Sequence, residues 1–401
     1  MTLGNPRRGM MLTIRRAGTI VTFGLVFSIG ISSLLGCGSG GGDTGSSTPT
    51  DAMPQCTAPP NVGADLTTAL AKYPNLSDWC LFDVVKTAGK AKLVAKRGVI
   101  AYDLNTPLFS DYARKYRAVW MPPGTSAKYV ADDVFDFPVG TILIKTFGFA
   151  ADLRKPDDNV TLIETRLIVR TADKWVPLPY AWNDEQTEAT LQVGGNVKAL
   201  SFIGEAGETV ASNYLLPSSA QCGTCHADEA STFQLLGPKA KNLNRDFVYD
   251  GVTENQLAHW SKVLALTGAP SPSAAPKMAK FDDPASGTVE ERARAYLEVN
   301  CAHCHDEHRT ARTTGLFLPI AESDAAKWGR CKPPVAAGPG TGGFSYDIVP
   351  GKPDQSVLFF RIQSTTPGLM MPALGRSVVH KEGVELVRAW ISGLSGDCSG
   401  K

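Results

Sequence analysis

The pentad Cys-x-x-Cys-His occurs twice, at Cys222–His226 and at Cys301–His305. Its two thiols have the spacing needed to form thioether bonds with the two vinyl groups of one porphyrin, and the adjoining imidazole can ligate the iron. With the Cys and His content of this chain, about 0.003 such pentads are expected by accident. The sequence therefore predicts two haem c groups, bound through the thiols of Cys222, Cys225, Cys301 and Cys304 and ligated by His226 and His305.

Three other uses of these thiols remain open. Each pair could be a redox Cys-x-x-Cys, a disulfide or part of a zinc site. A zinc ribbon places its cysteine pairs about 15–20 residues apart. The two pentads of this chain lie much further apart, which disfavours a ribbon.

The N-terminus has the pattern of a bacterial lipoprotein signal peptide at residues 1–36. Four arginines precede an uncharged segment that extends from Ala17 to Gly42. Leu34–Cys37 resembles a lipobox, whose cysteine becomes the acylated first residue; an ordinary signal peptide or an uncut anchor is the alternative. We therefore expect export to the periplasmic or cell-surface side and lipid anchoring through Cys37. Because Gly38 follows that cysteine, the outer membrane is favoured in a host that has one.

Composition limits the partners. Residues 37–55 are rich in Gly and Ser and are expected to form a flexible tether. Loss of residues 1–36 removes four arginines and no acidic residue, which leaves the mature chain slightly negative. No basic patch suggests nucleic acid, so we expect a membrane, contacted through the lipid, and a redox protein as partners.

Nine cysteines are present, of which one belongs to the lipobox and four to the pentads. In an oxidising compartment the even remainder predicts two disulfides. Proximity in the sequence favours the pairs Cys56–Cys80 and Cys331–Cys398, and the two other pairings stay open.

The expected fold class is α+β multidomain, with an antiparallel β sandwich or barrel at residues 56–215. Short β-branched segments such as Val139–Phe147 and Thr161–Arg170 indicate its strands, and a short helix is expected near Leu66–Tyr73. Two mainly α-helical haem-binding units should follow, at residues 216–287 and 288–401. The irregular segment Gly268–Gly287 joins them.

Capping signatures place two helices in these units. Thr253 with Gln256 predicts a helix from Glu254 to Leu266. Thr288 with Glu291 predicts a helix that leads directly into Cys301.

The second haem-binding unit resembles class I cytochrome c. In that family a helix before the haem motif crosses the C-terminal helix, and Ala293 and Leu297 occupy the contact positions here. The apolar face of Lys381–Leu394 fits the C-terminal helix. Met370-Met371-Pro372 resembles the loop that supplies a methionine ligand, with Met371 as the expected ligand and Met370 as the reserve. Packing of both methionines in the haem pocket is the alternative.

The first haem-binding unit resembles that family less closely. Pro238 follows Gly237 where the family has a Gly-Pro whose carbonyl steadies the proximal histidine, so Pro238 is a cofactor-contact candidate. Pro217 excludes a long helix before Cys222. Met278 is the tentative sixth ligand, His259 is its rival, and an iron without a distal ligand is the third option.

As a whole, the chain from about Thr106 to Trp390 resembles a family of secreted bacterial dihaem cytochromes c with an N-terminal β-rich domain. The likeness rests on Asn105–Tyr112, Leu243–Asp246, Val299–His305 and Met370–Pro372. It implies two haems and electron transfer and adds no substrate.

The expected function is therefore a lipid-anchored carrier of single electrons between a partner and an acceptor. The alternative is a dihaem peroxidase or oxidase whose first iron keeps an open distal site, with His259 or a glutamate as acid–base group. No catalytic residue is assigned. A third possibility is that the β-rich domain binds a carbohydrate, a polymer or a dehydrogenase partner while the haem-binding part receives its electrons.

Overall fold

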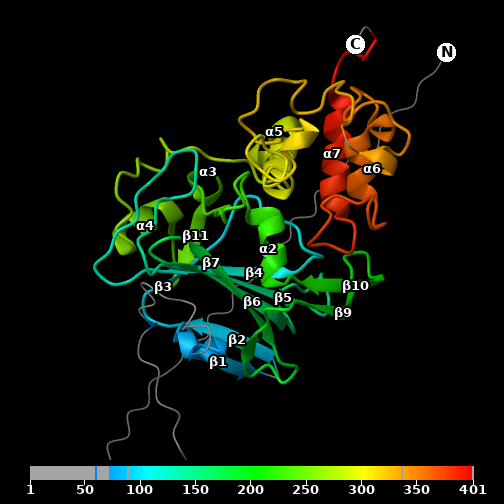
Figure 1. Cartoon of the computed structure of the whole chain (residues 1–401). Helices are drawn as coiled ribbons and strands as arrows, with labels where there is room; N and C mark the ends of the chain where they lie inside the picture. The colour runs from blue at the N-terminus through cyan, green and yellow to red at the C-terminus, as the bar shows by residue number, and fades with distance from the viewer. Residues whose placement is uncertain (1–58, 61–71, 88–89, 336, 400–401) are drawn as a thin grey trace, which may run out of the picture. The chain divides into compact units, whose positions relative to one another are not determined.

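The computed structural model describes residues 59–60, 72–87, 90–335 and 337–399 (Figure 1). The predicted signal peptide, Cys37, the tether and Cys56 lie outside these residues, as does most of the helix predicted near Leu66–Tyr73. The described residues belong to one compact unit. Among the described residues, no helix has the length and apolar character needed to cross a membrane.

An open antiparallel sheet of six strands organises the β-rich part, and its strands neighbour each other in chain order. The two β-branched segments that the sequence predicts as strands lie in this sheet, because β-branched side chains pack well on its pleated surface. The predicted strand Thr161–Arg170 is confirmed, and Val139–Phe147 corresponds to a strand that begins later, at Ile142. The six are β3 (Val99–Tyr102), β4 (Arg114–Trp120), β5 (Ile142–Phe149), β6 (Thr161–Arg170), β7 (Trp175–Trp182) and β8 (Ala189–Leu191).

Both faces of this sheet are covered. On one face Ile144 and Leu167 pack against the 3-10 turn η1 (Leu76–Trp79) and the hairpin of β1 (Phe82–Thr87) and β2 (Lys90–Ala95). On the other face Val119 and Leu143 pack against α3 (Ala240–Leu243) and α4 (Gln256–Val263). The second face is the one that borders the pentads, as described below. Two further hairpins are β9 (Asn196–Ile203) with β10 (Thr209–Leu216), and β11 (Asp246–Tyr249) with β12 (Val252–Asn255).

The helix before the second pentad is confirmed. α5 (Val289–Asn300) begins with the predicted capping box, in which Thr288 accepts from the Glu291 N–H and the Glu291 carboxylate accepts from the Thr288 N–H. It ends at Cys301. The other predicted capping box is wrong: β12 continues to Asn255, which therefore caps α4, and that helix ends at Val263 instead of Leu266.

The predicted crossing of α5 with the C-terminal helix α7 (Lys381–Gly393) is also present. Ala293 and Leu297 are fully buried and pack with Val387 and Trp390 of α7 in one core. The close contact between α7 and α5 depends on Gly383, because a Cβ at that position would collide with the ring of Tyr296. Beside this pair lies the short α6 (Val357–Gln363).

The predicted fold class is wrong. The described part of the chain has more strand than helix, and the N-terminal part is an open sheet with accessory hairpins instead of a sandwich or barrel. The region after residue 216 is not mainly helical, because its six α-helices have 4 to 13 residues and lie between long irregular segments. Frequent Gly and Pro explain this, since both end helices early. The 3-10 turns there are η2 (Pro284–Ser286), η3 (Arg312–Thr314), η4 (Gly338–Thr341) and η5 (Pro353–Gln355).

Candidate cofactor site

The first pentad lies in the short helix α2 (Ser219–His226). Ser218 caps the helix by accepting from the Gln221 N–H, and the Gln221 side chain accepts in return from the Ser218 N–H. Cys222 and Cys225 are three positions apart, so a helix places them on the same side. Both are free thiols and half-buried.

His226 is held in one orientation. Its Nδ1 lies 2.9 Å from the carbonyl oxygen of Gln234, and the ring of Phe233 stacks on it with centroids 4.5 Å apart. Burial lowers the pKa of His226 to about 4, so the ring is neutral at pH 7. A neutral ring that donates from Nδ1 keeps the lone pair of Nε2 available for a metal. The steadying carbonyl thus comes from Gln234 and not from the Gly237-Pro238 pair to which the family resemblance assigned it.

A cavity of about 690 Å³ opens beside α2. Its volume lies within the range of roughly 300–1,000 Å³ that is common for small-molecule and cofactor sites. Met278 lines this cavity and is 3% exposed, and Pro238 lines it as well. His259 does not line it: that ring stacks on Tyr249 at 3.5 Å and contacts the Glu254 carboxylate at 2.6 Å. Of the two candidate sixth ligands, the structure brings only Met278 to the first pentad.

The second pentad continues the chain from α5 as a tight turn. The His305 N–H donates to the Cys301 carbonyl at 2.9 Å, and the Leu318 N–H donates to the His305 carbonyl at 2.8 Å. Burial lowers the pKa of His305, and a hydrogen bond to the Leu316 carbonyl opposes part of that effect. Nδ1 of this ring lies 3.4 Å from the hydroxyl oxygen of Thr314, and the ring is neutral at pH 7 because its pKa lies below the ordinary value.

A second cavity of about 230 Å³ is lined by Cys301, Cys304, His305 and Met371. The predicted methionine lies there, whereas Met370 lines neither cavity. Because this volume is below the roughly 300 Å³ at the lower end of ordinary ligand sites, a macrocycle fits only if the lining segments move apart. Leu316, Leu318, Leu358 and Ile362 form an apolar part of the remaining wall, and Asn300, Asp347 and Arg361 contribute polar groups.

One stretch of the β-rich part positions both methionine segments. Thr106 is fully buried, and its hydroxyl donates to the Ala279 carbonyl at 2.8 Å, next to Met278. Asp111 is 1% exposed, and its carboxylate accepts from the Ser377 N–H at 2.7 Å and from the Val378 N–H at 3.0 Å. Through these contacts the stretch Asn105–Tyr112 tethers the segments around Met278 and Met371.

Arg376 organises the loop of Met371. Its guanidinium is buried and donates to the Met371 carbonyl at 2.8 Å. It also donates to carbonyls of both ends of this loop, those of Arg361, Ile362, Ser364 and Val378. Sequence inspection missed Arg376, because a single arginine in a loop carries no pattern.

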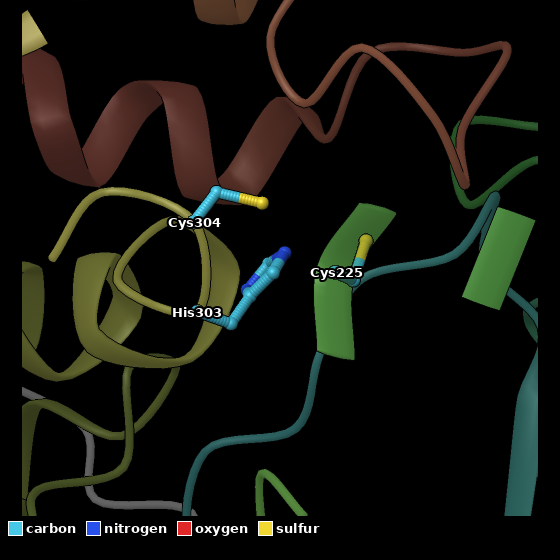
Figure 2. Close-up of side chains that lie close together, drawn as sticks. All are labelled: Cys225, His303 and Cys304. Atoms are coloured by element: carbon cyan, nitrogen blue, oxygen red, sulfur yellow. The ribbon is translucent and has the colours of Figure 1, made fainter. Parts of the chain in front are cut away.

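The two pentads meet. One ligand atom each of Cys225, His303 and Cys304 lies within 4.8 Å of the others, and Figure 2 shows Cys225 on one chain segment facing the other two residues on another. The Thr224 carbonyl accepts from the Thr310 hydroxyl at 3.1 Å, which ties the pentads together. A shared hydrogen bond lowers the pKa of the Cys304 thiol and raises that of Cys225. His303, Cys301 and Met371 line both cavities, so the two cavities adjoin.

No protein-family model, curated protein or solved structure matches this chain. The family resemblance therefore stays a prediction. What the molecule does must be argued from the two pentads, their cavities and the groups around them.

The remaining cysteines agree in part with the predicted pairing. Cys331 and Cys398 form a disulfide with a Cα–Cα distance of 5.3 Å, as their proximity in the sequence predicted. Cys80 is disulfide-bonded, and its predicted partner Cys56 lies outside the described residues.

Proposed function

We propose that this chain is a dihaem c-type cytochrome that transfers single electrons, with one haem bound at each pentad. The observation that carries the proposal is that each pentad presents two free thiols and a neutral imidazole to a cavity that is also lined by a methionine. When bound, haem supplies an iron that accepts and releases one electron.

The chain's own residues have distinct tasks in this proposal. Cys222 and Cys225 hold the first haem, and Cys301 and Cys304 hold the second. His226 and His305 would be the proximal ligands; the Gln234 carbonyl holds the ring of His226, and the Thr314 hydroxyl lies beside Nδ1 of His305. Met371 would hold the second iron from the distal side and Met278 the first, since each lines the cavity of its pentad. A histidine–methionine pair favours a high potential, which suits an electron carrier.

The contact between the pentads supports transfer between the two sites. The sulfur atoms of Cys225 and Cys304 lie within 4.8 Å of each other, and each would carry one edge of a haem. The two attachment edges are therefore neighbours. With haem bound at both pentads, this proximity would give an electron a short path from one site to the other.

We also propose that the protein is an exported lipoprotein anchored through Cys37. The support is the lipobox-like sequence and the Gly/Ser-rich tether that follows it. Replacement of Cys37 by serine in the expressed full chain should release the haem protein from the membrane fraction. Continued membrane association of that variant would contradict the anchor.

The experiment for the central proposal is a haem count by pyridine haemochrome on protein matured in a host that assembles cytochromes c. We expect two haems per chain, one haem after Cys222→Ser with Cys225→Ser, and one after Cys301→Ser with Cys304→Ser. His259→Gln is the matched control, because His259 lies outside both cavities, and it should keep two. Absence of bound haem from the parent chain would contradict the proposal.

A metal site is the second candidate function, favoured by the Cys225–His303–Cys304 cluster. Two cysteines and one histidine can bind zinc with a fourth position left for water. Haem attachment converts Cys225 and Cys304 to thioethers, so the two functions exclude each other at these residues. One zinc per chain in the matured protein, lost in Cys304→Ser and accompanied by no haem, would favour this candidate. No corresponding observation favours the peroxidase, because Met278 lines the cavity in which an open distal site would have to lie.

A further inference from the structure

Three cationic side chains form a row across the centre of the six-stranded sheet. Arg117 of β4 is directly opposite Lys145 of β5, and Lys145 is directly opposite Arg166 of β6. Side chains alternate between the faces of a strand, so all three point to the face that carries Val119, Leu143 and Ile168. All three line the 690 Å³ cavity of the first pentad. Like charges directly opposite each other are destabilising, so the positive charges of this row require negative charges nearby.

The compensation within the protein is incomplete. Arg166 forms a two-point ion pair with Glu164. Arg117 donates to one oxygen of Asp103 at 2.9 Å, but the other oxygen of Asp103 is taken by Arg245 at 2.9 Å. Four positive charges thus share two carboxylates, and the central cation, Lys145, receives neither.

Two hydrogen-bond donors of this row have no partner among the described residues. Within the described part of the chain, the Lys145 ammonium forms no hydrogen bond or ion pair, and it lies 4.8 Å from the centre of the Phe147 ring. Nη2 of Arg117 is buried and also has no partner there. Burial and the two flanking guanidinium groups lower the pKa of Lys145 well below its ordinary value. An unpaired ammonium between two arginines is costly unless an anion joins it.

Five other acidic residues line the same cavity, and within the described part of the chain no hydrogen bond or ion pair joins any of them to Lys145 or Arg117; they are Asp132, Asp133, Asp228, Glu298 and Asp306. Glu298 is paired with Lys241 at 2.5 Å, and Asp133 with Lys239 at 3.3 Å. The Asp228 carboxylate accepts from the Thr232 N–H and from the side chain of Gln234. The unused donors therefore face open cavity.

We propose that Arg117, Lys145 and Arg166 form an anion site that binds a carboxylate group inside the cavity of the first pentad. The carboxylate has two chemical sources: a propionate of the first haem, in which case the inference rests on the proposed function, or a free small carboxylate that enters the cavity. In both cases Lys145 and Nη2 of Arg117 donate to its oxygens. Charge-assisted hydrogen bonds of this kind are the strong ones.

The test uses the matured full chain and the variants Lys145→Met and Lys145→Arg. Lys174→Met is the control, since Lys174 is an exposed lysine in the turn between β6 and β7. Methionine removes the charge and keeps much of the side-chain volume, so the variant should fold. Two measurements are made: calorimetric titration with acetate, and infrared redox-difference spectra of protein whose haem propionates carry ¹³C.

A free carboxylate as occupant predicts saturable binding of one acetate per chain. This binding should weaken about tenfold or more in Lys145→Met, persist in Lys145→Arg and stay unchanged in Lys174→Met. A propionate as occupant predicts no acetate binding and a shift of one labelled carboxylate band in Lys145→Met only. The site is refuted if acetate does not bind and the labelled bands are the same in Lys145→Met and the parent.

The two proposals fail in different ways. If the matured chain carries no haem, the proposed function is wrong, and acetate titration of that chain alone decides whether the anion site exists. If two haems are present but neither acetate binding nor a labelled band depends on Lys145, the anion site is wrong and the dihaem proposal stands.

Discussion

Replacement of Met278 by alanine tests the least regular part of the site. Met278 lies outside any helix or strand, in the segment whose structure is hardest to predict from the sequence. It nevertheless lines the cavity of the first pentad. If Met278 is the distal ligand of the first iron, its removal should open one coordination position per chain. His259→Ala should open none, because His259 is held away from the cavity by Tyr249 and Glu254.

The structural cost of Met278→Ala can be worked out separately. Truncation of a buried methionine destabilises a protein by about 2–5 kcal/mol. Met278 is 3% exposed but borders a cavity, so part of its surface lacks packing partners already, and we expect about 2–3 kcal/mol. The fold should survive this loss, since its backbone N–H still donates to the Lys241 carbonyl at 2.6 Å.

Carbon monoxide binding to the dithionite-reduced protein is the assay. The parent should bind little ligand, Met278→Ala should bind one equivalent per chain, and His259→Ala should behave like the parent. Urea unfolding of the same samples measures the stability change. Binding of carbon monoxide by His259→Ala but not by Met278→Ala would refute the assignment. One equivalent bound by the parent itself would instead indicate an open first site and favour the peroxidase.

Three further predictions follow from the geometry. Met371→Ala should lower the reduction midpoint potential of one haem and allow carbon monoxide to bind there, whereas Met370→Ala should do neither. Equal redox titration curves for the parent and Met371→Ala would contradict the assignment of Met371 as a ligand. Leu297→Ala should lower the free energy of unfolding in urea by about 3–5 kcal/mol, because Leu297 is fully buried at the crossing of α5 and α7. Gly383→Ala should lower it by about 1–3 kcal/mol, because the added Cβ collides with Tyr296. Unchanged unfolding midpoints would show that the crossing is not formed. Cys331→Ser with Cys398→Ser should lower the unfolding free energy by about 4 kcal/mol, since the bond closes a loop of 67 residues, and a loss below 1 kcal/mol would mean that the bond is absent in solution.

Features encoded locally could be predicted from the sequence. The capping box of Thr288 and Glu291 fixes the start of α5, and the apolar positions around Ala293 and Leu297 fix the face that meets α7. The strand Thr161–Arg170 is likewise a local property of a β-branched run. The pentads themselves need only five neighbouring residues. These features depend on contacts within one or two turns.

Features that depend on long-range packing could not be predicted. A sequence does not state which strands are neighbours, so the row of Arg117, Lys145 and Arg166 emerges only from the register of β4, β5 and β6. The Gln234 carbonyl reaches His226 through a loop without a regular pattern. The prediction of the fold class was wrong for a related reason. The helix-start signal at Thr288 was correct, but Pro- and Gly-rich connections limit most helices of the second half to a few turns.

The most direct test of the central claim is the intact mass of the matured chain under denaturing conditions. Two haems fastened by thioether bonds stay with the polypeptide when it unfolds, and noncovalent cofactors and metal ions do not. We predict a mass that exceeds that of the polypeptide by two haems, with both additions mapped to peptides that contain Cys222–His226 and Cys301–His305. A bare polypeptide whose four pentad thiols all react with an alkylating reagent would contradict the account.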